Sequence, residues 1–557
     1  MPFNSPFSNV DIPNVDLLTW LFGSPDDKLS DEPLYLDSVN PGEKHISLQE
    51  YRSWVKRLSA GIQTKLGLKP QDKILVFSSN NIYFPVLLLG IVGAECVFTG
   101  ANPTFVAREL AYQIKDSHAK VLFVTPTSIP IALEAAKIVG LDPKNIYAFD
   151  DNVKDTRRDQ WAKLRIGGYW ADICVEKDDF RWRGFSTRDE ANTTAAINYS
   201  SGTTGMPKGV EITHRNFIAN CTQSLSMTED ELDYTPVLLA AIPMYHAYGM
   251  NYFALQSPKR GIKVYVMPKF DFVDYLRCIE KYRVTTVTAA PPLIVAFAKH
   301  PAVNKTDLSS IRSIGCGAAS LSAETALAAE AKFNNVKILQ GYGLSEVTCA
   351  VIVQKDNKKN LNPRRGSVGN IAPNCEAKVV DESGNELGRN QRGELWVRGP
   401  NVMKGYYNRP EATAETITND GWLKTGDIAY VDNSDLWYIV DRKKELIKIS
   451  GYQVAPAELE AVLLEHPEIA DAGVIGIKWA ENERPRAYLV KNAGSKVTTE
   501  DVLKYMSKAA ASYKQITGGV VWIDAIPKNP SGKILRKILR ERAAKEIKDT
   551  GDHRAKL

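Results

Sequence analysis

Short apolar runs alternate with longer helical patterns along the first part of the chain. Residues 73–79 (KILVFSS) and 120–125 (KVLFVT) have the length and apolar content of buried strands. Between them, residues 82–96 have the content of a buried helix, and residues 107–118 have the pattern of an amphipathic helix. This strand–helix alternation predicts a parallel sheet with helices on both faces.

The same alternation of strands and helices recurs further along the chain and is then followed by a pattern of strands and turns. The later elements are expected at residues 284–289, 311–316, 323–333 and 336–339. Together they predict a doubly wound α/β body over most of residues 1–360. Beyond it, residues 376–380 and 393–397 flank a turn-rich DESGN segment, which predicts an antiparallel sheet ending at residues 437–440.

The charged tetrapeptide DRKK at residues 441–444 is poorly hydrophobic and predicts a hinge between two domains. We therefore expect an α/β fold with a large N-terminal domain, residues 1–440, and a small α+β domain, residues 445–557. Residues 441–557 carry 22 Lys and Arg against 16 Asp and Glu, while the rest is nearly neutral. Such a basic surplus fits either an anionic ligand or solvated helices.

Composition excludes several classes of protein. With 557 residues, 44% hydrophobic and 24% charged, the chain has the composition of a globular protein rather than a disordered or fibrous one. Its net charge of +5 is too mild for a nucleic-acid binder. The seven cysteines are odd in number and form no CxxC, so neither a disulfide framework nor a zinc ribbon is indicated, and a reducing compartment is expected.

One apolar run has to be tested against a membrane span. Residues 237–255 lack formal charge, but they contain Pro243, His246, Gly249 and Asn251, which are costly in lipid. The run also fits a buried strand followed by a loop. The N-terminal residues have no basic segment followed by an apolar stretch, so no signal peptide is expected.

The strongest local signal is the loop YSSGTTGMPKG at residues 199–209, which follows an expected strand. Three glycines allow tight turns and close approach to an anion, four hydroxyls add donors, and Lys208 adds positive charge. It is not a Walker A loop, because Pro207 stands where that motif needs glycine. Taken alone, the loop fits a phosphate cradle or a flexible linker.

Seven motifs together give the chain a clear resemblance. Besides the loop, they are PMYHAYG (243–249), QGYGLSE (340–346), GELWVRG (393–399), WLKTGD (422–427), residues 441–460 with GYQVAP (451–456), and NPSGK (529–533). Their order and spacing resemble those of adenylate-forming enzymes, specifically the acyl-CoA ligases that include 4-coumarate:CoA ligases. The resemblance covers residues 45–540 and implies ATP, Mg²⁺ and CoA, a carboxylic acid substrate, and a mobile C-terminal domain.

The resemblance assigns a nucleotide site. Its expected ATP- and AMP-binding residues are Ser200, Ser201, Gly202, Thr203, Thr204, Gly205, Lys208, Gly317, Ala318, Ala319, Gln340, Gly341, Tyr342, Gly343, Ser345, Asp427 and Arg442. Tyr342 would lie against adenine, although such a tyrosine also fits core packing. Asp427 would accept hydrogen bonds from the ribose hydroxyls, joined by Arg442.

The resemblance also implies the catalytic set, Lys533, His246 and Glu346. Joining a carboxylate to the α-phosphate brings two anions together, so charge neutralisation and positioning should carry most of the catalysis. Lys533 would contact the carboxylate and the phosphate. Glu346 would hold Mg²⁺, which prefers one or two carboxylates plus phosphates. His246 would orient the acid or gate entry of the thiol.

The acid and CoA sides are also implied by the resemblance. The expected acyl pocket comprises His246, Tyr248, Tyr252, Gly317, Gly341, Gly343, Ala350 and part of residues 292–298. Lys448, Gly451 and Gln453 should serve thioester formation, with Lys444 near the pivot of the mobile domain. At positions 252 and 396 this chain has Tyr252 and Trp396, which differ from the residues typical of plant coumarate ligases. Coumarate specificity is therefore not implied by the resemblance.

Several other functions stay open at this level. Within the family, the alternatives are an adenylation enzyme that feeds a carrier protein and a luciferase-like oxygenase. A non-catalytic acyl or nucleotide sensor would be expected to have lost Lys533 or Glu346, and both are present. Short SxxK, YxN and KTG matches of the β-lactamase type arise by chance in a chain of this length.

The tripeptide Ala555-Lys556-Leu557 is a conservative variant of the Ser-Lys-Leu peroxisomal address. It predicts a peroxisomal import receptor as a partner and a peroxisomal location, with the cytoplasm as the alternative. Neither a membrane span nor a nucleic-acid partner is expected.

Overall fold

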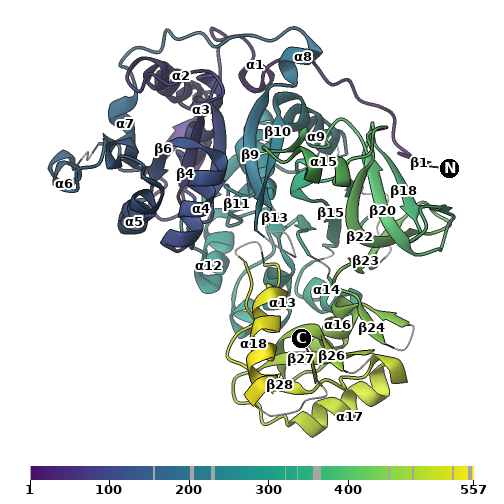
Figure 1. The fold of residues 1–557 in the computed structure, drawn as a ribbon. Helices are drawn as coiled ribbons and strands as arrows, with labels where there is room; N and C mark the ends of the chain where they lie inside the picture. The colour runs from purple at the N-terminus through teal and green to yellow at the C-terminus, as the bar shows by residue number, and fades with distance from the viewer. Residues whose placement is uncertain are drawn as a thin grey trace.

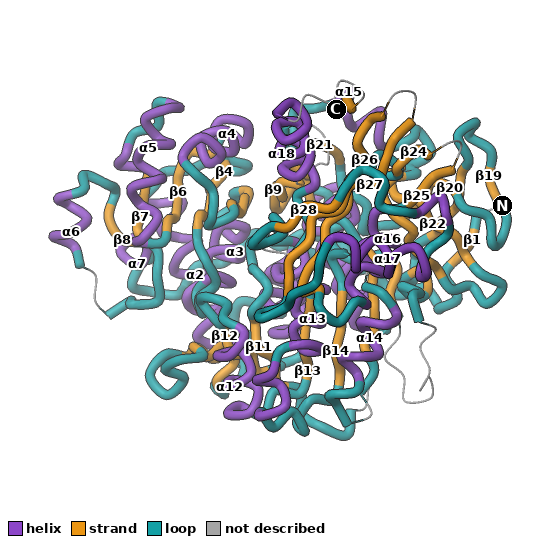
Figure 2. The backbone as a smooth tube through the Cα atoms, turned by 90° about the horizontal axis from the view of Figure 1, so that it is seen from below, coloured by secondary structure: helices purple, strands orange, loops and turns teal. Residues whose placement is uncertain are grey.

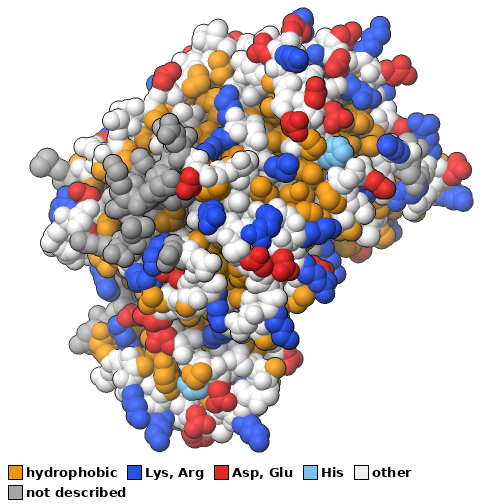
Figure 3. All heavy atoms as spheres, turned by 180° about the vertical axis from the view of Figure 1, so that it is seen from behind, with side chains coloured by type: hydrophobic (Ala, Val, Ile, Leu, Met, Phe, Trp, Pro, Cys, Tyr) orange, Lys and Arg blue, Asp and Glu red, His pale blue; other side chains and the backbone are white. Residues whose placement is uncertain are grey.

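The computed structural model describes residues 2–154, 157–200, 206–227, 232–319, 321–334, 336–354, 365–449, 452–479, 482–529, 532–549 and 555–556. A large upper part contains three sheets, and a smaller lower part begins near α16 (Pro456–Glu465) (Figure 1). From behind, Lys and Arg side chains are interspersed with Asp and Glu over both parts (Figure 3). Within these ranges no helix combines the length and apolar character of a membrane span.

The first sheet is mostly parallel. Its strands in spatial order are β21 (Gly405–Tyr406), β10 (Lys208–Thr213), β9 (Thr194–Ser200), β5 (Val97–Ala101), β4 (Lys73–Phe77), β6 (Ala119–Val124), β7 (Ile146–Ala148) and β8 (Gly168–Tyr169). Neighbours from β9 to β8 run parallel, and β10 is antiparallel to β9 and β21. The crossover helices are α3 (Phe84–Gly93), α4 (Ala107–Ser117) and α5 (Ile129–Val139).

The second sheet repeats this construction. Its strands in order are β17 (Asn370–Ile371), β16 (Ile352–Val353), β15 (Ile338–Tyr342), β14 (Ser313–Cys316), β13 (Thr286–Ala289), β11 (Val237–Ala240), β12 (Lys263–Val266), β2 (Pro33–Asp37) and β3 (His45–Ser47). Strands from β15 to β2 run parallel, with α12 (Phe272–Tyr282), α13 (Pro291–Lys299) and α14 (Ala323–Glu330) as crossovers. Ligands of such sheets bind beyond the carboxyl ends of the strands.

A buried amide joins the two sheets. The Asn80 side chain, which follows β4, donates to the carbonyls of Ala240 (3.3 Å) and Ile242 (3.0 Å) and accepts from the Met244 N–H (2.8 Å). Nearby, α3 is buried along its whole length, as expected of a helix that is hydrophobic all round. The Asn80 contacts fix the start of the PMYHAYG segment that carries His246.

The third sheet is antiparallel, as the strand pattern predicts. Its strands in order are β1 (Phe3–Asn4), β18 (Glu376–Val380), β20 (Gly393–Arg398), β22 (Leu423–Val431) and β23 (Trp437–Arg442), with β19 (Glu386–Leu387) paired to β18. Strands β22 and β23 place Asp427 directly opposite Arg442. This register brings two of the expected ribose-binding residues together.

The lower part has its own sheet and core. A hairpin of β24 (Ile447–Ile449) and β25 (Tyr452–Val454) precedes α16. The sheet then runs β28 (Val520–Trp522), β27 (Asn482–Lys491), β26 (Ile469–Trp479) and β29 (Ala555–Lys556), flanked by α17 (Thr499–Ala509) and α18 (Arg536–Asp549). Helices α14 and α16 are in contact, and seen from below both lie to the right of α13 (Figure 2).

A buried ion pair ties this part together. Both oxygens of Glu460 in α16 accept hydrogen bonds from Arg536 of α18 at 2.8 Å, and Glu460 also accepts from the Val474 N–H at 2.8 Å. Removing one partner of such a pair would leave an uncompensated buried charge. Since Arg536 lies three residues after Lys533, the pair also anchors the segment that follows the Lys533 turn.

Two expectations differ from the structure. The apolar run 237–255 continues past β11 into a helical segment, with a π-helix at Met250–Gln256, where a loop is expected. Apolar content alone does not separate a buried helix from a strand or loop. In the expected hinge 441–444, the first two residues belong to β23, because their charges have partners: the Asp441 carboxylate accepts from the Ala457 N–H at 2.9 Å. A domain boundary here stays a prediction.

Candidate active site

Lys533 is the centre of a cluster of charged side chains from four segments. Its ammonium interacts electrostatically with Arg442 of β23, Asp427 of β22 and Glu346, which follows β15. His246, from the loop after β11, is also within electrostatic range of Lys533. The structure therefore brings together the three residues of the expected catalytic set and both expected ribose-binding residues.

Asp427 is a buried carboxylate with two partners. Its Oδ2 accepts a hydrogen bond from the Tyr342 hydroxyl at 2.6 Å, and its Oδ1 lies 3.6 Å from Arg442 Nε. Burial raises the pKa of Asp427, while Arg442, Tyr342 and Lys533 act in the opposite direction. One hydrogen bond from Tyr342 and one ion pair with Arg442 orient this carboxylate, so it is preorganised to accept further hydrogen bonds from a ligand.

Lys533 is presented by a tight turn. The Lys533 N–H donates to Asn529 Oδ1 (2.8 Å), the Asn529 N–H donates to the Lys533 carbonyl (2.9 Å), and Gly532 has φ +83°. A Cβ on Gly532 would lie 2.9 Å from Pro292 at the start of α13. The turn therefore packs directly against the upper part of the molecule, and only glycine fits both the conformation and the space.

Burial and the neighbouring Arg442 lower the pKa of the Lys533 ammonium to about 8, and Asp427 and Glu346 oppose the shift. The side chain is thus mostly charged at neutral pH. It gains or loses its proton close to physiological pH, unlike an exposed lysine.

Glu346 lies in the 3₁₀ turn η5 (Ser345–Val347) and is oriented by a residue from the other sheet. Its Oε1 accepts a hydrogen bond from the Tyr406 hydroxyl at 2.9 Å. The Tyr406 ring in turn has the Lys208 ammonium 4.7 Å from its centroid, a cation–π distance. Tyr406 therefore connects the carboxylate with the lysine of the Gly/Ser/Thr-rich loop.

The chain after Glu346 is strained. Thr348 has φ +69° and ψ −49°, and the Cys349 N–H donates to the Val347 carbonyl at 2.8 Å, which makes a γ-turn of the rare form. The Thr348 hydroxyl donates to the Asn401 carbonyl at 2.8 Å and holds this conformation. A β-branched residue in this region costs free energy and is found mostly at functional sites.

His246 caps a short helical turn beside the site. Its Nδ1 accepts from the Tyr248 N–H at 3.3 Å, which leaves the proton on Nε2. Burial and the nearby Lys533 lower the pKa of His246 to about 4, so the imidazole is neutral at pH 7. A neutral imidazole can orient a carboxylate or another polar group without adding charge to the cluster.

The residues expected on the acyl side include glycines and two tyrosines that lie close together. A Cβ on Gly317 would lie 3.6 Å from the Gly341 carbonyl and 3.8 Å from the Tyr248 ring, so backbone faces the aromatic side chain. Tyr252 packs edge-on against Tyr248 with centroids 5.9 Å apart. Gly343 admits no side chain, because a Cβ there would lie 1.6 Å from the Cys349 carbonyl.

The remaining residues expected for the nucleotide and acyl sides lie in or after β14, β15 and β9. Gln340 is paired through its backbone with Gln354, Ala318 has φ +73°, and Ala319 follows it. Ala350 is held by the Asn220 side chain, which donates to its carbonyl at 2.5 Å. Ser200 lies opposite Lys208 on adjacent strands. The expected residues 201–205 lie outside the described ranges.

Comparison with known proteins identifies this arrangement. The family description AMP-binding enzyme matches residues 27–407. The chain belongs to the AMP-binding enzyme family. The description AMP-binding enzyme C-terminal domain matches residues 458–533, which includes Lys533. This confirms the resemblance expected from the seven motifs.

Individual relatives agree with this assignment. A protein named 4-coumarate–CoA ligase 2 from Nicotiana tabacum is 37% identical over 560 residues, covering 97% of each chain. Peroxisomal OPC-8:0-CoA ligase 1 from Arabidopsis thaliana is 39% identical over 484 residues, covering 86% of this chain and 85% of its own. The crystal structure of ATP-bound MatB from Rhodopseudomonas palustris has a TM-score of 0.81 at 26% identity and covers 95% of this chain and 98% of its own.

The chemistry of an AMP-binding enzyme fits the residues present. Within the described ranges no group of three or more His, Cys, Asp and Glu side chains gathers as a metal site. Glu346 supplies one carboxylate, which suits Mg²⁺ bound mainly by nucleotide phosphates and water. Asp427 suits the vicinal hydroxyls of a ribose, and Lys208 and Lys533 supply positive charge for phosphates.

The expected CoA-side residues lie away from this cluster. Lys448 and Gln453 face each other across the β24–β25 hairpin, and Gln453 Nε2 donates to Glu382 of the antiparallel sheet at 3.3 Å. Lys448 and Lys444 are exposed, and Gly451 lies outside the described residues. The structure therefore groups Lys533 with the nucleotide-side residues and does not group the CoA-side residues with them.

Two contributors to the site were not expected from the sequence. Tyr406 figured only in a chance YxN match, and no local pattern links it to Glu346, which is 60 positions away. Asn80, which holds the His246 loop, is likewise distant in sequence. A signal for Asn80 exists in retrospect: a polar residue directly after a buried strand often satisfies neighbouring backbone groups.

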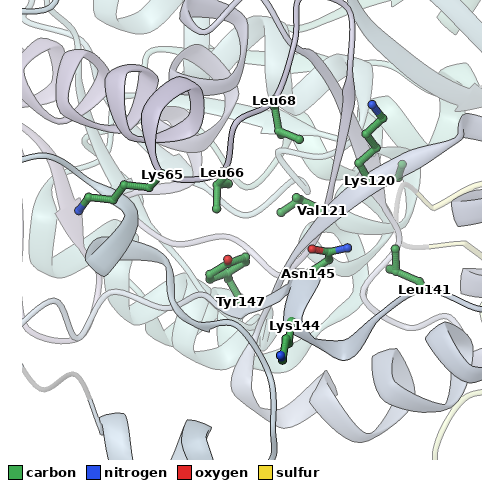
Figure 4. A pocket seen from close by; sticks show the side chains of 10 residues that line it. Lys65, Leu66, Leu68, Lys120, Val121, Leu141, Lys144, Asn145 and Tyr147 are labelled. Atoms are coloured by element: carbon green, nitrogen blue, oxygen red, sulfur yellow. The ribbon is translucent and has the colours of Figure 1, made fainter.

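The cavity of about 510 Å³ at the outer edge of the first sheet is a separate feature (Figure 4). Lys65, Lys120 and Lys144 line it, but their ammonium groups point in different directions (Figure 4). Lys65 donates to the carbonyls of Asp172 and Cys174, and Lys120 pairs with Asp72 at 2.7 Å. Its cations therefore do not converge on a ligand.

The raised pKa of Asp427 leads to a stability prediction. Because burial disfavours the charged carboxylate, Asp427→Asn should raise the melting temperature at pH 7, although it should impair nucleotide binding. The buried carboxylate lowers the free energy of unfolding at pH values above its folded-state pKa, and this loss disappears as Asp427 takes up its proton. The gain should therefore shrink towards pH 4 in thermal unfolding scans of both proteins. A gain that is equal at both pH values would contradict this explanation.

Proposed function

We propose that this AMP-binding enzyme is an ATP-dependent carboxylic acid:CoA ligase. In the first step a carboxylate oxygen attacks the α-phosphorus of ATP, forming acyl-AMP and releasing pyrophosphate. In the second step the CoA thiol attacks the acyl carbon, forming acyl-CoA and releasing AMP. The observation that carries the proposal is the clustering of Lys533, Asp427, Arg442 and Glu346 at the carboxyl edge of the second sheet. Its relatives named as CoA ligases support it.

The first step needs two anions held together. The Lys533 ammonium offsets their repulsion and stabilises the charge that develops as the acyl–phosphate bond forms. Asp427 and Arg442 hold the ribose, so that the α-phosphate is placed relative to Lys533. Glu346 would hold Mg²⁺ together with the phosphates, and the ion would supply positive charge for the leaving pyrophosphate. Tyr406 keeps the Glu346 carboxylate oriented for this role.

The second step needs the thiol to reach the acyl carbon while Lys533 is no longer required. We propose that the C-terminal part turns about the segment near Lys444, withdrawing Lys533 and presenting the β24–β25 hairpin. Lys448, Gly451 and Gln453 would then border the path of the pantetheine arm. The hydrogen bond from Gln453 to Glu382 is weak enough for such a motion to break.

For the acid, we propose an aryl, cinnamic-type or fatty acid. The acyl side offers apolar surface from Tyr248 and Tyr252, backbone from Gly317 and Gly341, and one neutral polar group, His246. One relative is named a 4-coumarate ligase and another an OPC-8:0 ligase.

We also propose that Ala555-Lys556-Leu557 directs the protein to peroxisomes through an import receptor. One relative is named peroxisomal. The backbone of Ala555 and Lys556 pairs with Trp479 and Lys478 of β26, and Leu557 lies outside the described residues.

The ligase proposal is tested by a screen for pyrophosphate release. Purified protein is incubated with ATP, Mg²⁺ and aryl, cinnamic or fatty acids, with and without CoA. At least one acid should give acyl-AMP without CoA and acyl-CoA with it. Lys533→Ala should lower the first step about 10²- to 10³-fold, because it removes one electrostatic stabiliser. Release of pyrophosphate with no thioester from any acid would contradict the CoA step.

The packing of Gly532 leads to a matched pair of variants. Gly532 and Gly494 both have positive φ, +83° and +80°, so alanine strains both turns by about 1–2 kcal/mol. Only at Gly532 would the new Cβ meet Pro292, whereas nothing lies within 4 Å at Gly494. Gly532→Ala should therefore slow acyl-AMP formation about tenfold or more by displacing Lys533. Gly494→Ala should leave the rate near wild type in single-turnover assays, and equal rates in the two variants would disprove the role of this contact.

The Lys533 and His246 pKa values predict the pH profile of acyl-AMP formation. With a free-enzyme pKa of about 8, Lys533 loses its charge as the pH rises, so kcat/KM for ATP should fall above about pH 8. His246, with a pKa of about 4, should add no inflection near pH 6. Lys533→Arg should be slower but lack the alkaline decline, because guanidinium stays charged. If kcat/KM of this variant still falls above about pH 8, the titrating group is not Lys533.

A further inference from the structure

The helix α13 contacts the lower part of the molecule at both of its ends. At its start, Pro292 and Ala290 abut Gly532 in the turn that presents Lys533. At its end, the Lys299 ammonium donates hydrogen bonds to the carbonyls of Leu464 (3.0 Å) and Ile469 (2.6 Å). These two carbonyls belong to α16 and β26, so Lys299 crosses between the two parts of the molecule.

The contact of Lys299 with the Leu464 carbonyl caps the C-terminal end of α16. The Leu464 carbonyl is among the last four of α16, which have no partner within the helix. A cation is favourable there, because the carbonyl ends of the peptide dipoles converge. The α16 sequence has no basic residue in its own last turn. Lys299 thus supplies from the upper part the positive charge that this helix lacks.

The segment held by Lys299 is coupled to the Lys533 turn. Asp471, two residues after Ile469, accepts from Lys528 Nζ at 2.9 and 2.7 Å through its two oxygens. Lys528 begins the turn and is bridged through its backbone to Ile534, on the far side of Lys533. Lys299 therefore fixes the segment that in turn fixes the base of the Lys533 turn.

We propose that Lys299 is a positioning residue that holds the C-terminal part in the orientation for acyl-AMP formation. This inference rests on the proposed two-step ligase function. The bonds from Lys299 exist only while α16 lies against α13, so a turn of the C-terminal part about Lys444 breaks both of them. Lys299 then stabilises one orientation selectively, and it favours the first step over the second.

The variant Lys299→Met tests the proposal in single-turnover assays of each step. It keeps the length and apolar stem of lysine but loses the donors. Acyl-AMP formation should slow about tenfold, which corresponds to about 1.4 kcal/mol in the balance of orientations. Thioester formation from supplied acyl-AMP should be unchanged or faster. Lys299→Arg, which keeps the charge and the donors, should recover acyl-AMP formation to within about twofold of wild type.

Lys305→Met is the matched control, because Lys305 is an exposed lysine six residues further along with no interaction described for it. It should leave both steps unchanged. Equal losses in both steps for Lys299→Met, or no loss in the first step, would overturn the proposal for Lys299. Activity of the wild-type protein in the same assays would still support the ligase function. If wild type forms no acyl-AMP from any acid, the ligase function fails and this inference falls with it. Thermal unfolding of each variant distinguishes a loss of stability from a specific effect on acyl-AMP formation. A general loss of stability would affect both steps.

Discussion

The site depends on keeping Lys533 charged in a place where burial and a neighbouring guanidinium both favour its neutral form. Asp427 and Glu346 oppose that tendency, and the balance leaves the pKa of Lys533 at about 8. Each carboxylate is therefore needed by the lysine as well as by its own ligand. Each is held in turn by a tyrosine hydroxyl, Tyr342 for Asp427 and Tyr406 for Glu346. The cluster is one electrostatic unit built from three sheets and a turn.

That unit can be assembled only if distant segments are placed accurately. Asp427 and Arg442 meet because β22 and β23 are paired in register, which the sheet enforces by itself. Lys533 is different, since it arrives on a separate part of the chain and is positioned by packing of Gly532 against α13. The contact of Gly532 with α13 involves no side chain of the glycine, so it can be broken and re-formed easily. This suits a lysine that serves one step of a two-step reaction.

Much of the fold could be predicted from the sequence, because buried parallel strands appear as short apolar runs such as residues 73–79. The seven motifs predicted the family, and the structure brings Lys533, Asp427 and Glu346, which were expected in its catalytic and nucleotide sites, into one cluster. Two kinds of feature were beyond such reasoning. Contacts between remote residues, such as Tyr406 with Glu346, leave no local pattern. Nor do the charges of residues 441–444 reveal that Asp441 and Arg442 lie in β23, where Asp441 accepts from the Ala457 N–H and Arg442 lies beside Asp427.

The position of α13 links the acid to the orientation of the C-terminal part. Its start abuts the Lys533 turn, its end binds α16 through Lys299, and residues between them are expected to border the acyl pocket. Packed helices transmit displacement because protein interiors have few voids to absorb it. If the acid binds against α13 as expected, an acid that fits would leave both contacts intact and an ill-fitting acid would disturb them. Selection of the acid and placement of Lys533 would then be governed by one rigid element.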